Sequence, residues 1–190
     1  MYNGELFIKK AIESILAQTF TDFELIISDN SSTDSTEEIC QNFLKKDNRI
    51  RIFKQKENIG IHRNFNFLLS QAKGKYFAWT AVDDYLDNDF MEKNLKVLES
   101  HDSIVSSIGK IIPYGTDSLN IDSKLIHTSN YPKFLKNYVK HARRNKMTDT
   151  APVSGNINSK IRTLLKITKS LGRFYGVHRT EQLKQCIVQK

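Results

Sequence analysis

The chain has 190 residues, of which 39% are hydrophobic and 10% aromatic, and its formal net charge is +8. This length and composition are typical of one globular domain and exclude an intrinsically disordered chain. No apolar run approaches the roughly 18 residues of a membrane-spanning helix, and the N-terminus lacks the pattern of a secretory signal. The two cysteines, Cys40 and Cys186, lie far apart, so we expect buried thiols in a reducing compartment.

The charge is unevenly distributed. Residues 133–190 carry a net charge of +12, whereas residues 1–132 carry −4, counting Lys, Arg, Asp and Glu. An acidic front followed by a basic tail indicates an anionic partner for the tail. That partner is a membrane surface, a phosphate-bearing ligand or a nucleic acid.

In chain order, the spacing of apolar residues alternates between the helical and the strand period over the first 112 residues. Asp34, with Glu37 three residues later, is predicted to cap the second helix, and Lys73-Gly74 to end the third. The predicted elements are a helix over 5–18, a strand over 23–28, a helix from Asp34 to about Lys45, a strand over 51–55, a helix over 61–72, a strand over 75–82, a helix over 90–99, and one or two strands within 104–112.

This alternation predicts an α/β fold, with a mainly parallel sheet flanked by helices and right-handed crossovers. The chain opens on a helix, so we expect the first strand of the first βα unit to be missing. We divide the chain into residues 1–112, the motif-bearing half, and residues 113–190, a basic and mostly helical region. Helices are predicted in that region over 131–144, over 161–171 and from Thr180.

An apolar, aromatic run, Tyr76 to Val82, ends in two adjacent carboxylates, Asp83 and Asp84. We expect a strand buried on both faces that stops at this pair, because Asp is a poor strand residue. Ligands of open α/β sheets bind at that edge, and paired carboxylates suit Mg²⁺ or Mn²⁺ bridged to phosphates. The alternative is a solvated Asp-Asp turn.

A second polar cluster, Asp29-Asn30, follows the predicted strand 23–28 and is expected at the same sheet edge. Its amide and carboxylate could read a base or a ribose by hydrogen bonds. Tyr2, in the turn that opens the chain, would lie on that edge and could stack on a base. The alternatives are plain helix capping for Asp29 to Asp34 and an ordinary surface tyrosine for Tyr2.

Several motifs in order resemble family 2 glycosyltransferases over residues 2–112, and weakly over 174–185. The resemblance rests on Tyr2-Asn3-Gly4-Glu5, on Ser14 to Phe20, on Asp22 to Asp34 with its Asp29-Asn30, on Asn58-Ile59-Gly60, on Gly74 to Phe77, on Asp83-Asp84 and on Tyr175 to Arg179.

The resemblance implies a GT-A fold, a nucleotide-diphosphate-sugar donor (a UDP-sugar first) and a divalent cation. Tyr2 and Asn30 correspond to the base-contacting pair, with Asp29 beside them. Asp83 and Asp84 correspond to the DxD-type motif, with Asp84 as the direct metal ligand.

The chain also departs from the family pattern. Asn30 replaces a common Asp, and Ala81 replaces the first acid of the metal motif. Family members carry an arginine in the helix after Asn58-Ile59-Gly60, and its position corresponds more closely to Phe65 in this chain. We consider Arg63 as its substitute. An inverting transfer needs a general base for the acceptor hydroxyl, and neither Asp149 nor Glu181 lies in a recognisable context for it. We therefore expect either a fragment truncated at both ends or a degenerate copy of a sugar-transferring enzyme, with transfer weak or absent.

The resemblance predicts transfer to a glycan or lipid-linked acceptor, in the cytoplasm or at the inner face of the membrane. The basic helix 131–144 either packs on the domain or lies on an anionic membrane. An alternative function is that of a sugar nucleotidyltransferase, which would need a Gly-rich phosphate-binding loop near the N-terminus, and the sequence lacks one. A nucleic-acid-binding module would want a recognisable motif, which it also lacks, so we expect no nucleic-acid partner. The histidines form no ligand-like spacing.

Overall fold

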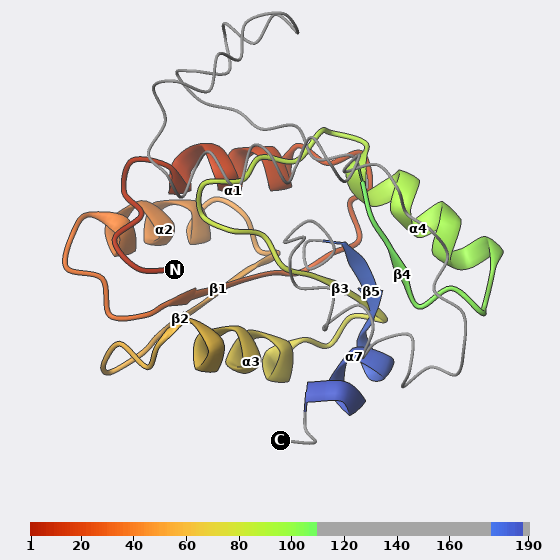
Figure 1. Cartoon of the computed structure of the whole chain (residues 1–190). Helices are drawn as coiled ribbons and strands as arrows, with labels where there is room; N and C mark the ends of the chain where they lie inside the picture. The colour runs from red at the N-terminus through yellow and green to blue at the C-terminus, as the bar shows by residue number, and fades with distance from the viewer. Residues whose placement is uncertain (110–175, 188–190) are drawn as a thin grey trace, which may run out of the picture.

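The computed structural model describes residues 1–109 and 176–187 (Figure 1). The predicted alternation of helices and strands is confirmed along this part of the chain. Its elements are α1 (Ile8–Leu16), β1 (Leu25–Asp29), α2 (Thr36–Leu44), β2 (Ile50–Lys54), α3 (Ile61–Gln71), β3 (Tyr76–Ala78), α4 (Phe90–Ser100), β4 (Ser106–Ser107), β5 (Val177–Arg179) and α7 (Thr180–Ile187).

The described strands form two separate sheets. β1 and β2 pair in parallel, with Ile27 opposite Ile52. In the other sheet β5 lies between β3 and β4 and is antiparallel to both, with His178 opposite Phe77. Helices α1 and α2 lie on one side of the β1–β2 pair and α3 lies on the other (Figure 1). The predicted parallel pairing is therefore confirmed for β1 and β2, and the chain adds an antiparallel strand from beyond residue 175.

The strand predicted over 75–82 is shorter than expected. β3 ends at Ala78, and its partner β5 supplies only Val177–Arg179. An extended segment keeps a strand ladder only where a neighbour supplies hydrogen bonds. Residues 79–82 have no such neighbour among the described residues, so Asp83 and Asp84 follow the strand after a short irregular stretch and not directly.

Helix boundaries also differ from the prediction at two points. α1 begins at Ile8 because residues 4–7 form a turn, in which the Phe7 amide donates to the Gly4 carbonyl. The N-cap of α2 is Ser35 and not Asp34. Asp34 still binds the start of the helix, because its Oδ1 accepts the Thr36 amide at 3.0 Å. Glu37 contacts Lys54 of β2 in place of the helix N-terminus.

Two apolar clusters hold these layers together. The first joins α1, β1, α2 and β2 through Ile12, Ile27, Cys40 and Ile50. The second joins α3, the end of β3 and α7, and its buried members are Leu69, Trp79 and Leu183. Cys40 is fully buried, as predicted, and burial raises the pKa of its thiol to about 12, which leaves the thiol unreactive.

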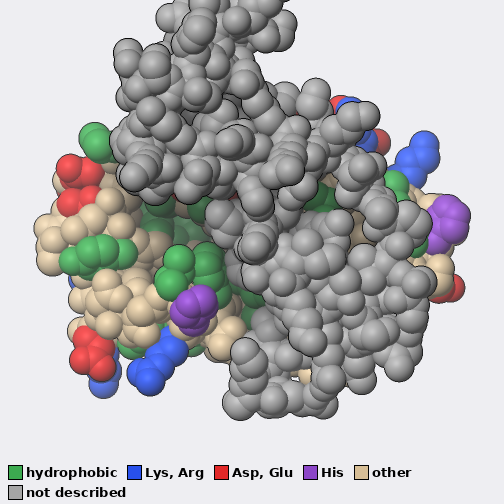
Figure 2. All heavy atoms as spheres, in the orientation of Figure 1, with side chains coloured by type: hydrophobic (Ala, Val, Ile, Leu, Met, Phe, Trp, Pro, Cys, Tyr) green, Lys and Arg blue, Asp and Glu red, His purple; other side chains and the backbone are tan. Residues whose placement is uncertain are grey.

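The predicted last helix is confirmed as α7. The predicted helices over 131–144 and 161–171, together with Asp149, lie outside the described residues. Within the described ranges, no helix has the length and apolar character needed to cross a bilayer. On the face drawn in Figure 2, the described Lys, Arg, Asp and Glu side chains lie scattered near the rim and form no large patch of one charge.

Candidate functional site

Asp29 is the last residue of β1, and the following polar loop folds back onto it. Its side chain is 1% exposed, and its Oδ1 accepts hydrogen bonds from the Ser32 amide at 3.1 Å and from the Ser32 hydroxyl. Ser31 has a positive φ of 67°, which reverses the chain between them. The carboxylate therefore shapes the loop after β1, which is the capping chemistry that the Asp- and Ser-rich sequence allowed.

Asn30 is buried and ties this loop to the turn after β2. Its Nδ2 donates to the Asn58 Oδ1 at 2.8 Å, and its Oδ1 accepts the Ile59 amide at 2.9 Å. Both halves of the side-chain amide are thus engaged with residues 58 and 59. The sequence marked Asn58-Ile59-Gly60 as a turn but carried no signal for this partnership.

The N-terminal turn lies on the same loop. The Asn3 amide donates to the Ser32 hydroxyl at 2.9 Å, and the Gly4 amide donates to the buried Thr36 Oγ1 at 2.8 Å. Asn3 returns a bond, because its Oδ1 accepts the Thr33 amide at 2.9 Å. Tyr2 lies beside this turn with 49% of its surface exposed, which leaves its ring available for stacking on a planar group.

The N-terminal turn also contacts the segment that carries the acidic pair. A Cβ added to Gly4 would lie 2.5 Å from the Val82 Cγ2, closer than real Cβ contacts, so a larger residue here would force Val82 to shift. Val82 directly precedes Asp83. The turn at residues 2–4 therefore joins the loop after β1 to residues 83–89, which we call the acidic loop. Tyr2, Asp29-Asn30 and Asp83-Asp84 thus lie in one contiguous region.

Asp83 and Asp84 lie in an irregular turn after β3, which agrees with the turn alternative for the backbone. Asp83 is exposed and Asp84 is half-buried. Burial, followed by the charge of Asp83, raises the pKa of the Asp84 carboxyl. A cation would relieve both effects, and hard carboxylate oxygens suit Mg²⁺ or Mn²⁺. Among the described residues, no group of three or more His, Cys, Asp and Glu side chains is placed to hold a metal ion, so phosphate or water oxygens would complete the coordination.

Ser14 of α1 and Gln18, two residues after that helix ends, hold the acidic loop from the side. The Gln18 Nε2 donates to the Asp87 carbonyl at 2.7 Å, and its Oε1 accepts the Met91 amide at 2.9 Å. The Leu86 amide donates to the Ser14 hydroxyl at 3.2 Å. Gln18 is 3% exposed. Sequence reasoning missed this glutamine, because a polar residue at a helix end ordinarily faces solvent.

The structure places Arg63 on the exposed side of the first turn of α3. Its neighbour Asn64 is the buried one: the Ser28 hydroxyl donates to the Asn64 Oδ1 at 2.6 Å, and the Gln55 Nε2 donates to Ser28 at 3.2 Å. Sequence reasoning missed Asn64, which connects α3 to β1. Glu181 is exposed in the first turn of α7, with its Oε1 3.9 Å from the Lys184 Nζ. This position adds no support for Glu181 as the general base.

Comparisons with known proteins agree with this arrangement. Residues 1–165 match the family model described as glycosyl transferase family 2. The putative teichuronic acid biosynthesis glycosyltransferase TuaG of Bacillus subtilis (strain 168) is 33% identical over 141 residues, which is 73% of this chain and 55% of that protein.

Two solved structures share the fold. One is S. aureus TarS 1–349 in complex with UDP-GlcNAc, with a TM-score of 0.52 and 24% identity over 60% of this chain and 35% of that one. The other is the mannosyltransferase PcManGT from Pyrobaculum calidifontis in complex with GDP-Man and Mn²⁺, with a TM-score of 0.54 and 20% identity over 58% and 34%. The chain thus spans about half, or less, of the length of the proteins it matches.

Proposed function

Because this chain belongs to glycosyl transferase family 2, we propose that it transfers a sugar from a nucleoside-diphosphate sugar to a glycan or lipid-linked acceptor. The observation that carries this proposal is the N-terminal turn. It is hydrogen-bonded to the loop after β1 and packs against Val82, ahead of the acidic pair. A nucleotide lying across this turn would have its base near Tyr2 and its diphosphate near Asp84.

In this proposal the nucleotide side of the site consists of Tyr2, Asp29, Asn30, Arg63 and Asp83. Tyr2 stacks on the base, and the end of β1 supplies polar groups for the base and ribose. Asn30 is held by Asn58 and Ile59, so it contributes by keeping that edge in place as well as by its own polarity. The GT-A relatives bind either UDP-GlcNAc or GDP-Man, and UDP is the nucleotide we propose first.

Asp84, assisted by Asp83, is the proposed holder of Mg²⁺ or Mn²⁺. When bound, the cation would neutralise charge on the departing diphosphate. In an inverting transfer, the acceptor hydroxyl attacks the anomeric carbon while the diphosphate leaves from the opposite face, and a general base takes the hydroxyl proton. We assign no residue to that role. We place the reaction in the cytoplasm, at the inner face of the membrane for a lipid-linked acceptor.

Calorimetric titration of the purified chain with UDP tests the proposal, in Mn²⁺ and then in excess EDTA. We expect affinity to fall at least about tenfold without the cation, and to fall equally in Asp84→Ala. The matched control is Asp87→Ala, an exposed acid of the same loop, with a change of less than about twofold. Titration with GDP decides the nucleotide. Equal UDP affinity in wild type and Asp84→Ala would remove the acidic pair from the site.

A further inference from the structure

Residues 3–5 of the N-terminal turn are joined to the segment 32–36 by five hydrogen bonds of backbone amides, which we call the clasp. Three consecutive amides of the turn donate to side chains of the segment, and two amides of the segment donate to side chains of the turn. The bonded pairs are Asn3 with Ser32 and with Thr33, Gly4 with Thr36, and Glu5 with Asp34 and with Ser35. Because bonds run in both directions, the turn cannot shift along the segment without losing several of them.

Glu5 takes part in the clasp with both its backbone and its side chain. Its amide donates to the Asp34 Oδ2 at 3.1 Å, and its Oε2 accepts the Ser35 amide at 3.0 Å. Ser35 is the N-cap residue of α2, so the Glu5 carboxylate lies at the positive end of that helix, where a negative charge is favourable. Asp34 binds the next amide, that of Thr36. Glu5 thus caps a helix that begins 30 residues further along the chain.

The clasp lies at two strained positions of the backbone. Asn3 and Ser31 have φ angles of 49° and 67°, and they are the only residues other than glycine with a positive φ in the described part of the chain. Such a conformation persists where the surrounding contacts fix it. Asn3 belongs to the clasp, and Ser31 directly precedes Ser32. Loss of clasp bonds would therefore free the turn to relax.

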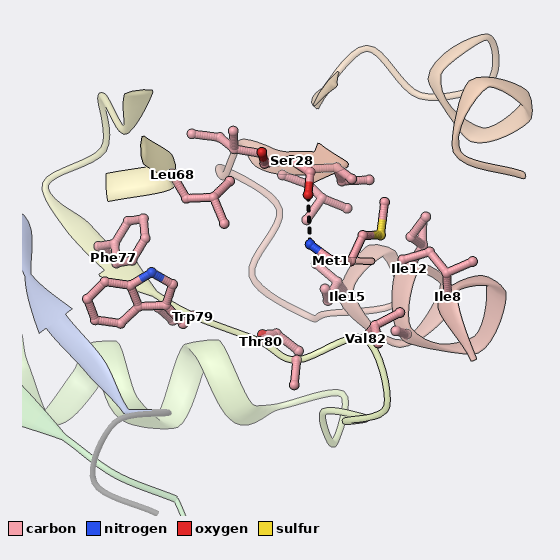
Figure 3. A pocket seen from close by; sticks show the side chains of 16 residues that line it. Met1, Ile8, Ile12, Ile15, Ser28, Leu68, Phe77, Trp79, Thr80 and Val82 are labelled. Carbon is pink, nitrogen blue, oxygen red and sulfur yellow. Dashed lines mark hydrogen bonds between the residues drawn. The ribbon is translucent and has the colours of Figure 1, made fainter. Parts of the chain in front are cut away.

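Packing on the inner side of the turn is incomplete. Met1 and Val82 border an apolar cavity of about 110 Å³, which lies between β1 and the segment 77–82. Figure 3 shows Met1 in the middle of the lining, with Ile12 on one side and Trp79 on the other. Side chains next to a void lack part of their contacts, so the turn depends on the clasp on its outer side.

The clasp determines where the Tyr2 ring lies. Tyr2 is 49% exposed, and within residues 1–109 and 176–187 its side chain has no hydrogen bond or ring contact. The position of the ring therefore follows from the backbone of residue 2, which continues directly into Asn3. A ring that is held in place before a ligand arrives raises the affinity for that ligand, because less order has to be created on binding.

We propose that Glu5 is a positioning residue for the nucleotide, whose carboxylate closes the clasp and so fixes the turn with Tyr2 facing the base. This inference rests on the proposed function, in which Tyr2 stacks on the base. Glu5 acts through Tyr2 and does not touch the nucleotide. Its side chain is exposed, and exposed polar contacts contribute little to stability. The role of Glu5 should therefore be seen in nucleotide affinity more than in unfolding.

The first experiment is calorimetric titration with UDP in Mn²⁺ of wild type, Glu5→Ala and Glu5→Gln. We expect Glu5→Ala to lower UDP affinity at least about fivefold, because the binding-competent turn becomes a minor state. Its Tm should fall by no more than about 3 °C. Glu5→Gln keeps an oxygen that accepts the Ser35 amide, so its affinity should stay within about twofold of wild type. An affinity in Glu5→Gln as low as in Glu5→Ala would overturn the proposal.

The matched control is Glu13→Ala. Glu13 is an exposed glutamate of α1 whose carboxylate lies 4.0 Å from the Lys9 Nζ, and it takes no part in the clasp. Its removal should leave UDP affinity within about twofold of wild type. A loss equal to that of Glu5→Ala would mean that the charge of this region, and not the clasp, affects binding.

A double-mutant cycle tests whether Glu5 acts through Tyr2. Tyr2→Ala removes the stacking ring and keeps the acidic pair. In that background, Glu5→Ala should lower UDP affinity by less than about twofold further, because two residues that act as a unit are not additive. Equal losses from Glu5→Ala with and without the Tyr2 ring would overturn the proposal, since Glu5 would then act on the site independently.

Amide hydrogen exchange without nucleotide tests the clasp itself. The Ser35 amide should exchange at least about tenfold faster in Glu5→Ala than in wild type, and at an unchanged rate in Glu13→Ala. An unchanged Ser35 rate in Glu5→Ala would overturn the proposal even where affinity falls. Failure of the proposed function has a different signature: wild type then binds neither UDP nor GDP, and the positioning role falls with it. UDP binding that Glu5→Ala leaves unchanged overturns the positioning role alone.

Discussion

The two parts of the candidate site are held in opposite ways. At the end of β1, the side chains of Asp29, Asn30 and Asn3 form hydrogen bonds within the protein. In the acidic loop, Asp83 is exposed and Asp84 is half-buried beside a like charge. The first region is organised before any ligand arrives, whereas the second concentrates negative charge that a cation would neutralise. Preorganisation lowers the cost of binding, and unpaired charge supplies the attraction.

The difference lies in which groups hold each region. Short polar side chains such as Asp, Asn, Ser and Thr bond to backbone groups a few residues away, and the stretch from 28 to 36 consists almost wholly of them. The acidic loop, residues 83–89, is also rich in Asp and Asn, but it is held from outside, by Ser14 of α1 and by Gln18 just after that helix. The following substitutions test whether the loop after β1 is held by its own side chains, and whether the carboxylates of the acidic loop are left available for a ligand.

The largest effect is expected from Asn30→Ala. It removes a buried amide that bonds Asn58 and Ile59, and leaves both partners short of a hydrogen bond. We expect the free energy of unfolding to fall by about 2–3 kcal/mol, measured by urea titration. Asn48→Ala, at an exposed position, should change it by less than about 0.5 kcal/mol. A similarly small effect at Asn30 would show that the β1 edge is not held by its side chains.

Gln18→Ala should have the next largest effect. The change removes the bonds to the Asp87 carbonyl and the Met91 amide, so we expect a loss of about 1–2 kcal/mol and faster hydrogen exchange at Met91. The same change at Gln41 of α2 is the control. If exchange at Met91 is unchanged, Gln18 does not hold the acidic loop.

Glu24 lies outside both parts and ties the residue before β1 to β2 and to the end of α3, because its carboxylate accepts the Lys73 amide at 2.7 Å and bonds Arg51 of β2 at 2.6 Å. Burial alone would raise the pKa of Glu24, but hydrogen bonds from the Lys73 amide and from Arg51 outweigh it and hold the pKa below the ordinary 4.5. A depressed carboxyl pKa stabilises the fold above the unfolded value, and this contribution is lost as pH falls through the folded value.

Glu24→Gln should therefore cost about 1 kcal/mol at pH 7 and reduce the loss of stability below pH 4.5. Urea titrations of both proteins between pH 7 and pH 3 measure this, with Glu38→Gln, exposed on α2, as the control. Parallel pH profiles for wild type and Glu24→Gln would contradict the assignment.

The smallest effect on stability is expected from Asp84→Asn. Burial and the charge of Asp83 raise the pKa of Asp84, so its ionised form is slightly unfavourable in the folded chain, and neutralising it should change stability by no more than about 0.5 kcal/mol, toward a gain. Cation-dependent UDP binding should still be lost. A stability loss as large as that of Asn30→Ala would mean that the acidic loop is a structural element and not a ligand site.

The sequence by itself determined the order of elements, the parallel pair of β1 and β2, the buried thiol of Cys40 and the positions of the polar clusters, because apolar periodicity and short polar side chains act over a few residues. It misjudged the strand over 75–82, since a strand's length depends on its neighbours and β5 supplies only three residues.

Only the tertiary structure decided how the clusters meet. Asn30 with Asn58, Asn64 with Ser28 and Gln18 with Met91 are partners separated by 28 to 73 residues, and Gly4 and Val82, which are in contact, are 78 residues apart. No local pattern encodes such pairs, because a buried polar side chain bonds whatever the fold brings within about 3 Å. The apolar cavity between β1 and the segment 77–82 is also decided by the tertiary structure. It exists because the two sheets lie side by side, and no single segment of the chain predicts it.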